Sequence, residues 1–166
     1  MKSKNAYLLP VPEKAIQKEV WGESKEAPAH INGKDMHPAF GDEKNAVDFY
    51  CSEGTKIYAA YDGEVILVKG DSKEGGRDPK YASIANSITI RHKNGEYTNY
   101  LHMKYKGVFV KKGDKVSKGD VIGLVGTTGW TPASHLHFSV FKITGKNPFV
   151  DYKTLQFKLE NYAASW

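Results

Sequence analysis

The stretch SITIRHKNGEYTNYLH, residues 87–102, decides the fold class. It holds two runs with strand-like alternation, 87–92 and 97–102, on either side of Asn94-Gly95. Runs rich in β-branched and aromatic residues are typical of strands, and Asn-Gly tolerates the positive φ angles of a type I′ turn. We therefore expect a β-hairpin, with His92 facing solvent at its tip.

Similar short runs lie on both sides of this hairpin, and Asp62-Gly63 is a second hairpin signal. Two longer stretches, residues 69–85 and 126–134, contain Gly and Pro and are predicted to be loops of the kind that often form sites. We predict an all-β fold, mainly antiparallel and β-sandwich-like, with long groove-forming loops. The other runs cover residues 46–49, 57–60, 63–68, 108–110, 121–125 and 135–141.

The length of 166 residues suits a single core. Residues 1–30 are rich in Pro, Glu and Lys, with a short helix-like periodicity across residues 15–21. We expect a short N-terminal helix or coil, a lead-in that packs on the domain. Residues 31–150 are predicted to form the domain itself, and residues 151–166 a C-terminal tail.

The net charge of +5 and the pI of about 9.1 favour contact with an anionic polymer, such as a bacterial wall polymer. The basic residues are scattered rather than clustered with aromatic residues, which argues against nucleic acid as a partner. No apolar run reaches the roughly 18 residues of a membrane span, and no apolar core of a signal peptide follows the first residues. Cys51 is alone, so neither an intrachain disulfide nor a multi-cysteine zinc site is expected.

The run SHLHF, residues 134–138, places two histidines two positions apart. Successive side chains of a strand point to opposite faces, so His135 and His137 share one face and Leu136 and Phe138 share the other. We expect the apolar pair in the core and the imidazoles in a groove. Alone, this spacing is a weak indication of a site, because two imidazoles can also form an ordinary polar strand face.

Two more residues favour a metal site. Asp48 lies in the apolar run 46–49, where an unpaired carboxylate is costly and a metal ion would offset that cost. His102 ends the run 97–102, where a histidine can lean into a neighbouring site. Zinc binds imidazole nitrogen and carboxylate oxygen readily, and a catalytic zinc has three protein ligands and a water. Two histidines and one aspartate would supply that shell.

The order of these residues resembles the lysostaphin-type, or LytM-like, zinc endopeptidases, which cut peptide cross-bridges in bacterial peptidoglycan. The resemblance covers about residues 32–148, and the order and spacing of its stretches together make it specific. These stretches are AVDF (46–49), EGTKIYAA (53–60), DGEV (62–65), ANSITIRH (85–92), YLH (100–102), VKKGDKV (110–116), GDVIG (119–123), GTTG (126–129) and SHLHF (134–138).

The resemblance implies a lysostaphin-type peptidase fold and a zinc-dependent endopeptidase that acts on the peptides of peptidoglycan. By position, it implies that Asp48 and His137 are zinc ligands. It also implies that His135 and His102 are the non-ligand pair that activates the water and stabilises the tetrahedral intermediate, with His135 on the water. The implied location is the bacterial envelope, the outside of the cell or a phage particle, and the basic surface would contact anionic wall polymers.

The sequence departs from the family pattern at the first ligand. The family usually has a histidine four residues before the aspartate, and that position is Lys44 here, whose ammonium cannot coordinate a metal while protonated. A subset of the family has this histidine further upstream, and NGKDMH, residues 32–37, suits that arrangement. We predict His37 as the ligand, with His30 or no replacement as the alternatives.

Other interpretations stay open. A chain without the first histidine would be a degenerate member that binds peptidoglycan or a partner cell-wall hydrolase without cutting. Residues 107–116 also resemble segments of biotinyl and lipoyl carrier domains, but such a domain needs a modifiable lysine at a hairpin tip and leaves the histidines unexplained. Trp130 and Tyr100 are either groove residues that stack on substrate or packing anchors.

Overall fold

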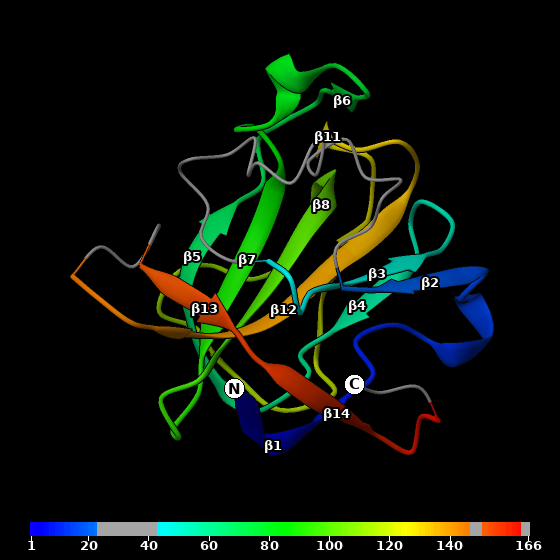
Figure 1. The fold of residues 1–166 in the computed structure, drawn as a ribbon. Helices are drawn as coiled ribbons and strands as arrows, with labels where there is room; N and C mark the ends of the chain where they lie inside the picture. Colours follow the sequence, from blue (N-terminus) through cyan, green and yellow to red (C-terminus); the bar gives the residue numbers. More distant parts are fainter. Residues whose placement is uncertain (23–42, 147–150, 164–166) are drawn as a thin grey trace.

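The structure is a computed structural model that describes residues 1–22, 43–146 and 151–163. These residues are mostly in strands, with short 3-10 helices η1 (Glu13–Ala15) and η3 (Pro79–Tyr81) between them (Figure 1). The predicted all-β fold is confirmed. The strands are β1 (Lys2–Leu8), β2 (Lys18–Trp21), β3 (Val47–Tyr50), β4 (Lys56–Tyr58), β5 (Gly63–Lys69), β6 (Gly75–Gly76), β7 (Asn86–Arg91), β8 (Tyr97–Val108), β9 (Lys115–Val116), β10 (Val121–Val125), β11 (Gly129–Trp130), β12 (His135–Ile143), β13 (Tyr152–Thr154) and β14 (Gln156–Glu160).

The main sheet has the strand order β2-β3-β12-β8-β7-β5-β9, and the neighbours along this path pair antiparallel. Strand β10 pairs with β4 and β8, and β13 pairs with the end of β12. Figure 1 shows that the sheet is strongly curved. Strand β12, which carries the His-x-His motif, therefore lies between β3, which carries Asp48, and β8, which carries His102.

The hairpin predicted from residues 87–102 is confirmed by the antiparallel pairing of β7 with β8. Its turn is not of type I′, because φ is positive at Gly95, where it is 79°, but not at Asn94. The Asn94 side chain instead accepts a hydrogen bond from the backbone N–H of Glu96, with an N···O distance of 3.0 Å. A polar side chain thus closes the turn where two left-handed residues were expected.

His92 is buried, so the prediction that it faces solvent is wrong. Its Nδ1 atom lies 2.7 Å from the carbonyl oxygen of Asp62, and its Nε2 atom lies 3.0 Å from the hydroxyl of Thr98. The ring also packs against Tyr7 and Tyr61, each at a centroid distance of 5.7 Å. Segments from elsewhere in the chain cover this end of the hairpin, which local sequence does not reveal.

The second predicted hairpin, at Asp62-Gly63, is not present, so this prediction is wrong. Strand β4 pairs with β10, whereas β5 pairs with β7 and β9, so the segment joins two strands that do not pair with each other. Glycine is needed at position 63 for a different reason, because a Cβ there would collide with the carbonyl oxygen of Arg91.

The N-terminal residues form more strand than expected. The helix-like periodicity across residues 15–21 corresponds to η1 and β2, and β2 pairs with β3 at the edge of the main sheet. Strand β1 pairs in parallel with β14, which brings the first and last described strands side by side (Figure 1). Pairing with distant strands thus overrides the local pattern here.

The core lies on the face of the sheet that receives Leu136 and Phe138, and both are fully buried, as the strand alternation predicts. Tyr100 is also fully buried, and Trp130 is almost so, which makes both of them packing residues. The Trp130 indole N–H donates to the carbonyl oxygen of Arg77 at 2.9 Å. In the described part of the chain, no helix is long and apolar enough to cross a membrane.

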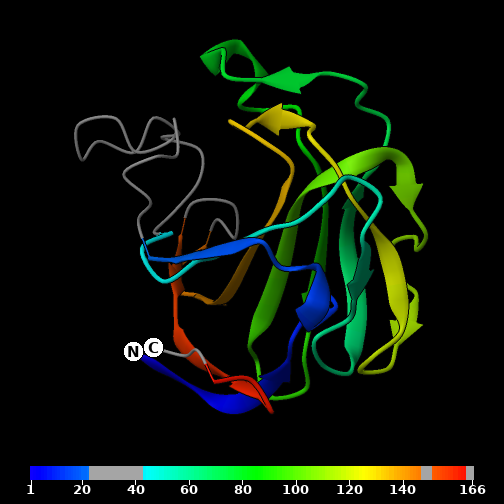
Figure 2. The same cartoon turned by 90° about the vertical axis from the view of Figure 1, so that its right-hand side faces the viewer.

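The two predicted loops contain a short paired segment each. Strand β6 of the first loop pairs in parallel with β11 of the second, with Gly75 opposite Gly129. Figure 2 shows this pair standing clear of the curved sheet, above the end of the sheet where β12 begins. The backbones approach so closely that a Cβ at Gly75 would collide with the carbonyl oxygen of Thr127. The two loops therefore support each other beside the histidines.

Candidate metal centre

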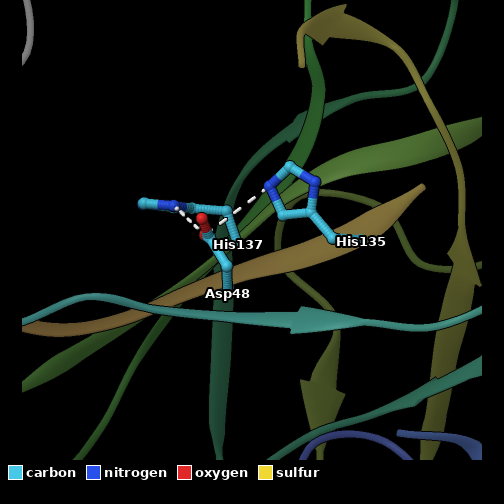
Figure 3. Close-up of side chains that lie close together, drawn as sticks. All are labelled: Asp48, His135 and His137. Atoms are coloured by element: carbon cyan, nitrogen blue, oxygen red, sulfur yellow. Dashed lines mark hydrogen bonds and ion pairs between the residues drawn. The ribbon is translucent and has the colours of Figure 1, made fainter. Parts of the chain in front are cut away.

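Asp48 and His137 face each other across the paired strands β3 and β12, where they are directly opposite in register. The Asp48 Oδ1 atom lies 2.8 Å from His137 Nδ1 and 3.5 Å from His135 Nε2 (Figure 3). The candidate ligand atoms of the three residues all lie within 4.8 Å of one another. The shared face predicted for the two histidines is confirmed, and Asp48 lies on it with them.

His102 reaches the same cluster through a backbone irregularity in β8. Leu101 lies opposite His137, so simple alternation would point the next side chain to the core. Instead, His102 has a φ of 63°, and the pairing of β8 with β7 changes register between Leu101 and Met103. This bulge turns the imidazole back to the site, where its ring centroid lies 4.6 Å from that of His135.

His102 and His135, the two histidines that the family resemblance implies are not ligands, are each held through Nδ1. His102 Nδ1 lies 2.8 Å from the carbonyl oxygen of Thr128, and His135 Nδ1 lies 2.9 Å from that of Ala133. A carbonyl oxygen can only accept, so we assign the ring proton to Nδ1 in each case. The Nε2 atoms of His102 and His135 are then unprotonated, and that of His135 points at Asp48 (Figure 3).

Glu43 also contacts the cluster, although no sequence motif points to it. Its Oε2 atom lies 3.2 Å from His137 Nε2, on the side of the ring away from Asp48. Its other carboxylate oxygen accepts a hydrogen bond from the Tyr152 hydroxyl. A lone glutamate in a turn is ordinary in sequence, and its partners come from β12 and β13, about 100 residues later in the chain.

The cluster sets the protonation of its members. Burial raises the pKa of Asp48, but His135 and His137 outweigh this effect and lower it to about 2. Burial lowers the pKa of His137, but its hydrogen bonds to Asp48 and Glu43 raise it to about 10. Burial and the neighbouring histidines lower the pKa of His102 to about 3, and burial also lowers that of His135. At neutral pH, His102 and His135 are therefore neutral rings that can accept a proton.

The residues present suit zinc. Carboxylate oxygen and imidazole nitrogen are common zinc ligands, and a buried carboxylate facing several imidazoles is a favourable place for a cation. Lys44, at the position where the family usually has its first histidine, is exposed. His37 and His30, the predicted source of that ligand and its alternative, lie outside the described residues. Their roles stay predictions.

An aspartate and three histidines gathered on one face of a curved antiparallel sheet are what a metallopeptidase domain requires of its site. Residues 42–150 match the model of Peptidase family M23, and the chain belongs to this family.

Curated relatives include two proteins of Vibrio cholerae serotype O1 that are named as peptidoglycan DD-endopeptidases. ShyA is 38% identical over 96 residues, which are 58% of this chain and 20% of ShyA. ShyC is 34% identical over 124 residues, which are 72% of this chain and 26% of ShyC. The chain thus spans about a quarter or less of the length of these relatives.

Solved structures show the same fold. The catalytic domain of the antimicrobial peptidase lysostaphin from Staphylococcus simulans is 29% identical, with a TM-score of 0.56 over 82% of this chain and 87% of that domain. A zinc-containing peptidase from Vibrio cholerae is also 29% identical, with a TM-score of 0.57 over 82% of this chain and 36% of that one. The predicted lysostaphin-type fold is thus confirmed.

Proposed function

We propose that this chain is a zinc-dependent endopeptidase that hydrolyses peptide cross-links of bacterial peptidoglycan. The observation that carries the proposal is the pairing of a carboxylate and an imidazole, Asp48 and His137, beside two neutral imidazoles on the same face of the sheet. Family membership and the names of the Vibrio relatives support peptidoglycan as the substrate.

Asp48 Oδ1 and His137 Nδ1 would hold the zinc ion, and His37 would supply the third protein ligand. Zinc bound there would lower the pKa of a water molecule toward neutrality and polarise the carbonyl group of the scissile bond. Asp48 and His137 lie directly opposite each other on adjacent strands. Both ligands sit on paired strands rather than on loops, which keeps their separation fixed.

His135 is proposed to take the proton from the attacking water. Its Nδ1–H is engaged by Ala133, so Nε2 is the atom that accepts the proton, and stacking on Tyr50 at a centroid distance of 4.9 Å fixes the plane of the ring. Once protonated, Nε2–H can donate the proton to the leaving amine. His102, whose Nδ1–H is held in the same way by Thr128, is proposed to stabilise the charge that develops on the carbonyl oxygen; in this role its Nε2 takes up a proton and donates it in a hydrogen bond to that oxygen.

The alternative is a non-catalytic member that binds peptidoglycan or a partner cell-wall hydrolase. The observation that favours it is Lys44 at the usual position of the first ligand. Without a replacement, two ligands would bind zinc weakly. Three buried or half-buried histidines in one cluster favour the enzyme, because a binding surface needs no such desolvated set.

The proposed setting is the bacterial envelope or the outside of the cell, with a phage particle as another location where peptidoglycan is cut. The net charge of +5 would draw the domain to anionic wall polymers. These contacts would be weakened by salt, because exposed charges are screened.

Metal analysis of the purified protein tests the proposal against its alternative. After incubation with zinc and removal of the excess, the enzyme interpretation predicts a stoichiometry near one zinc per chain. A stoichiometry near zero that added zinc does not restore would favour the non-catalytic binder.

A further inference from the structure

Glu43 contacts Nε2 of His137, the ring nitrogen that does not take part in the proposed metal site. Asp48 lies at Nδ1, at 2.8 Å, and Glu43 lies at Nε2, at 3.2 Å. An imidazole that binds a metal through one nitrogen carries its proton on the other. In the zinc-bound protein, the His137 Nε2–H would therefore donate to the Glu43 carboxylate.

Glu43 is itself held in place. The Tyr152 hydroxyl donates to its second oxygen, and the backbone N–H of Ala46 donates to its carbonyl oxygen at 2.9 Å, which closes a turn ahead of β3. Asn45, two positions further along the turn, is buried and donates from its side chain to the carbonyl oxygen of Thr154 at 3.0 Å. Strand β13 thus fixes the turn that carries Glu43.

The geometry separates Glu43 from the ligands. The atoms of Asp48, His135 and His137 that could hold a metal lie within 4.8 Å of one another, and among the described residues Glu43 is not part of that group. A single imidazole cannot direct both nitrogens at one ion. A carboxylate at Nε2 therefore acts on the ring and not on the metal.

We infer that Glu43 is a positioning residue that holds the Nε2–H of His137 and thereby presents Nδ1 to zinc, with Tyr152 orienting its carboxylate. The inference rests on the proposed function, since it requires that His137 binds zinc through Nδ1. Such outer carboxylates fix the tautomer and orientation of a metal-binding histidine and make it a stronger ligand. In this chain, the contact joins β12 to the turn that precedes β3.

Zinc affinity of the full chain tests the inference, measured by competition with a chelator for the wild type, Glu43→Ala, Glu43→Gln and Tyr152→Phe. We expect Glu43→Ala to weaken zinc binding about 10- to 100-fold, with smaller losses in the other two variants. The matched control is Glu64→Gln, which removes a carboxylate from β5 that pairs with Arg91 and Lys115. This control should bind zinc as the wild type does.

Two further measurements separate positioning from direct coordination or misfolding. Circular dichroism of the metal-free variants reports the fold. The visible spectrum of the cobalt-loaded protein should be the same for wild type and Glu43→Ala, because the ligands are unchanged. Wild-type affinity in a folded Glu43→Ala protein, or a cobalt spectrum that shows a lost ligand, would overturn the inference while leaving the proposed function intact. A wild type that binds no zinc would overturn both.

Discussion

The imidazole of His102 and the carbonyl oxygen of Thr128 are 2.8 Å apart, although simple alternation along β8 would send this side chain into the core. The bulge, in which His102 has a φ of 63°, turns the imidazole toward this oxygen. The loop that follows β10 supplies the carbonyl group. The ring is thus fixed beside Asp48 and His137, the two residues that the sheet pairs directly.

We expect His102→Ala to lower the rate of peptide hydrolysis by about 100- to 1,000-fold while the protein keeps its zinc, because the proposed role of this ring is to stabilise the charge on the carbonyl oxygen and not to bind the metal. The measurement is zinc content and hydrolysis on the same preparation. Loss of zinc together with activity would show that His102 is a ligand and would refute its assigned role.

Asp48 and His137 should behave differently from His102. Asp48→Ala and His137→Ala each remove a proposed ligand, so we expect both bound zinc and hydrolysis to be lost. The fold should survive, because the core face of β12 is unchanged by either substitution. Circular dichroism and metal analysis report the two properties separately, and a variant that keeps stoichiometric zinc would contradict the ligand assignment.

The first histidine ligand is tested by comparing His37→Ala with His30→Ala. We expect only His37→Ala to lose zinc and hydrolysis, because an open tetrahedral site needs a third protein ligand. His30→Ala is the matched control in the same part of the chain. The opposite result would move the ligand to His30, and full zinc content in both variants would exclude either histidine as a ligand.

The burial and hydrogen bonds of Glu96 lead us to expect that the protein loses stability in acid. Glu96 is fully buried and accepts hydrogen bonds from the hydroxyl groups of Ser3 and Tyr7 at 2.6 Å and from the N–H of Lys4 at 3.0 Å. Burial raises the pKa of Glu96, but these hydrogen bonds outweigh it and lower the pKa below the usual 4.5. The stabilisation is therefore fully present above about pH 4.5 and is lost as the pH falls through the lower folded-state value.

The test is urea unfolding of wild type and Glu96→Gln across this pH range. At neutral pH, we expect the variant to lose about 1–3 kcal/mol of unfolding free energy, since the amide cannot accept all three hydrogen bonds. Its stability should also fall less steeply in acid. Equal stability at neutral pH with an unchanged acid dependence would refute the role given to Glu96.

A side chain at Gly129 is expected to disturb the paired strands β6 and β11 beside the site. The φ of Gly129 is 84°, and a Cβ there would lie 2.5 Å from the Cβ of Ala85. Gly54 is the matched control, with a φ of 87° and open space around it. We expect Gly129→Ala to be less stable than Gly54→Ala and to raise KM, because β11 must shift away from Ala85. Indistinguishable stability and KM in the two variants would contradict this account.

Much of the site followed from short-range patterns. Alternation placed His135 and His137 on one face, which the structure confirms. The apolar surroundings of Asp48 indicated that its carboxylate needs compensation, and Asp48 lies 2.8 Å from His137, while the metal ion itself stays a prediction. Residues whose surroundings come from distant segments were missed. His92 is covered by the loop at Asp62, and Glu43 meets a tyrosine 109 positions away, so neither environment is encoded locally.

Hydrolysis of peptidoglycan cross-links is measured by digesting purified, cross-linked peptidoglycan and reading the products by mass spectrometry. We predict that the zinc-loaded protein converts cross-linked muropeptides into shorter peptides with the addition of one water per bond cut, and that His137→Ala does not. The identity of the new ends gives the bond. Cross-links that stay intact with the folded, zinc-loaded wild type would contradict the account.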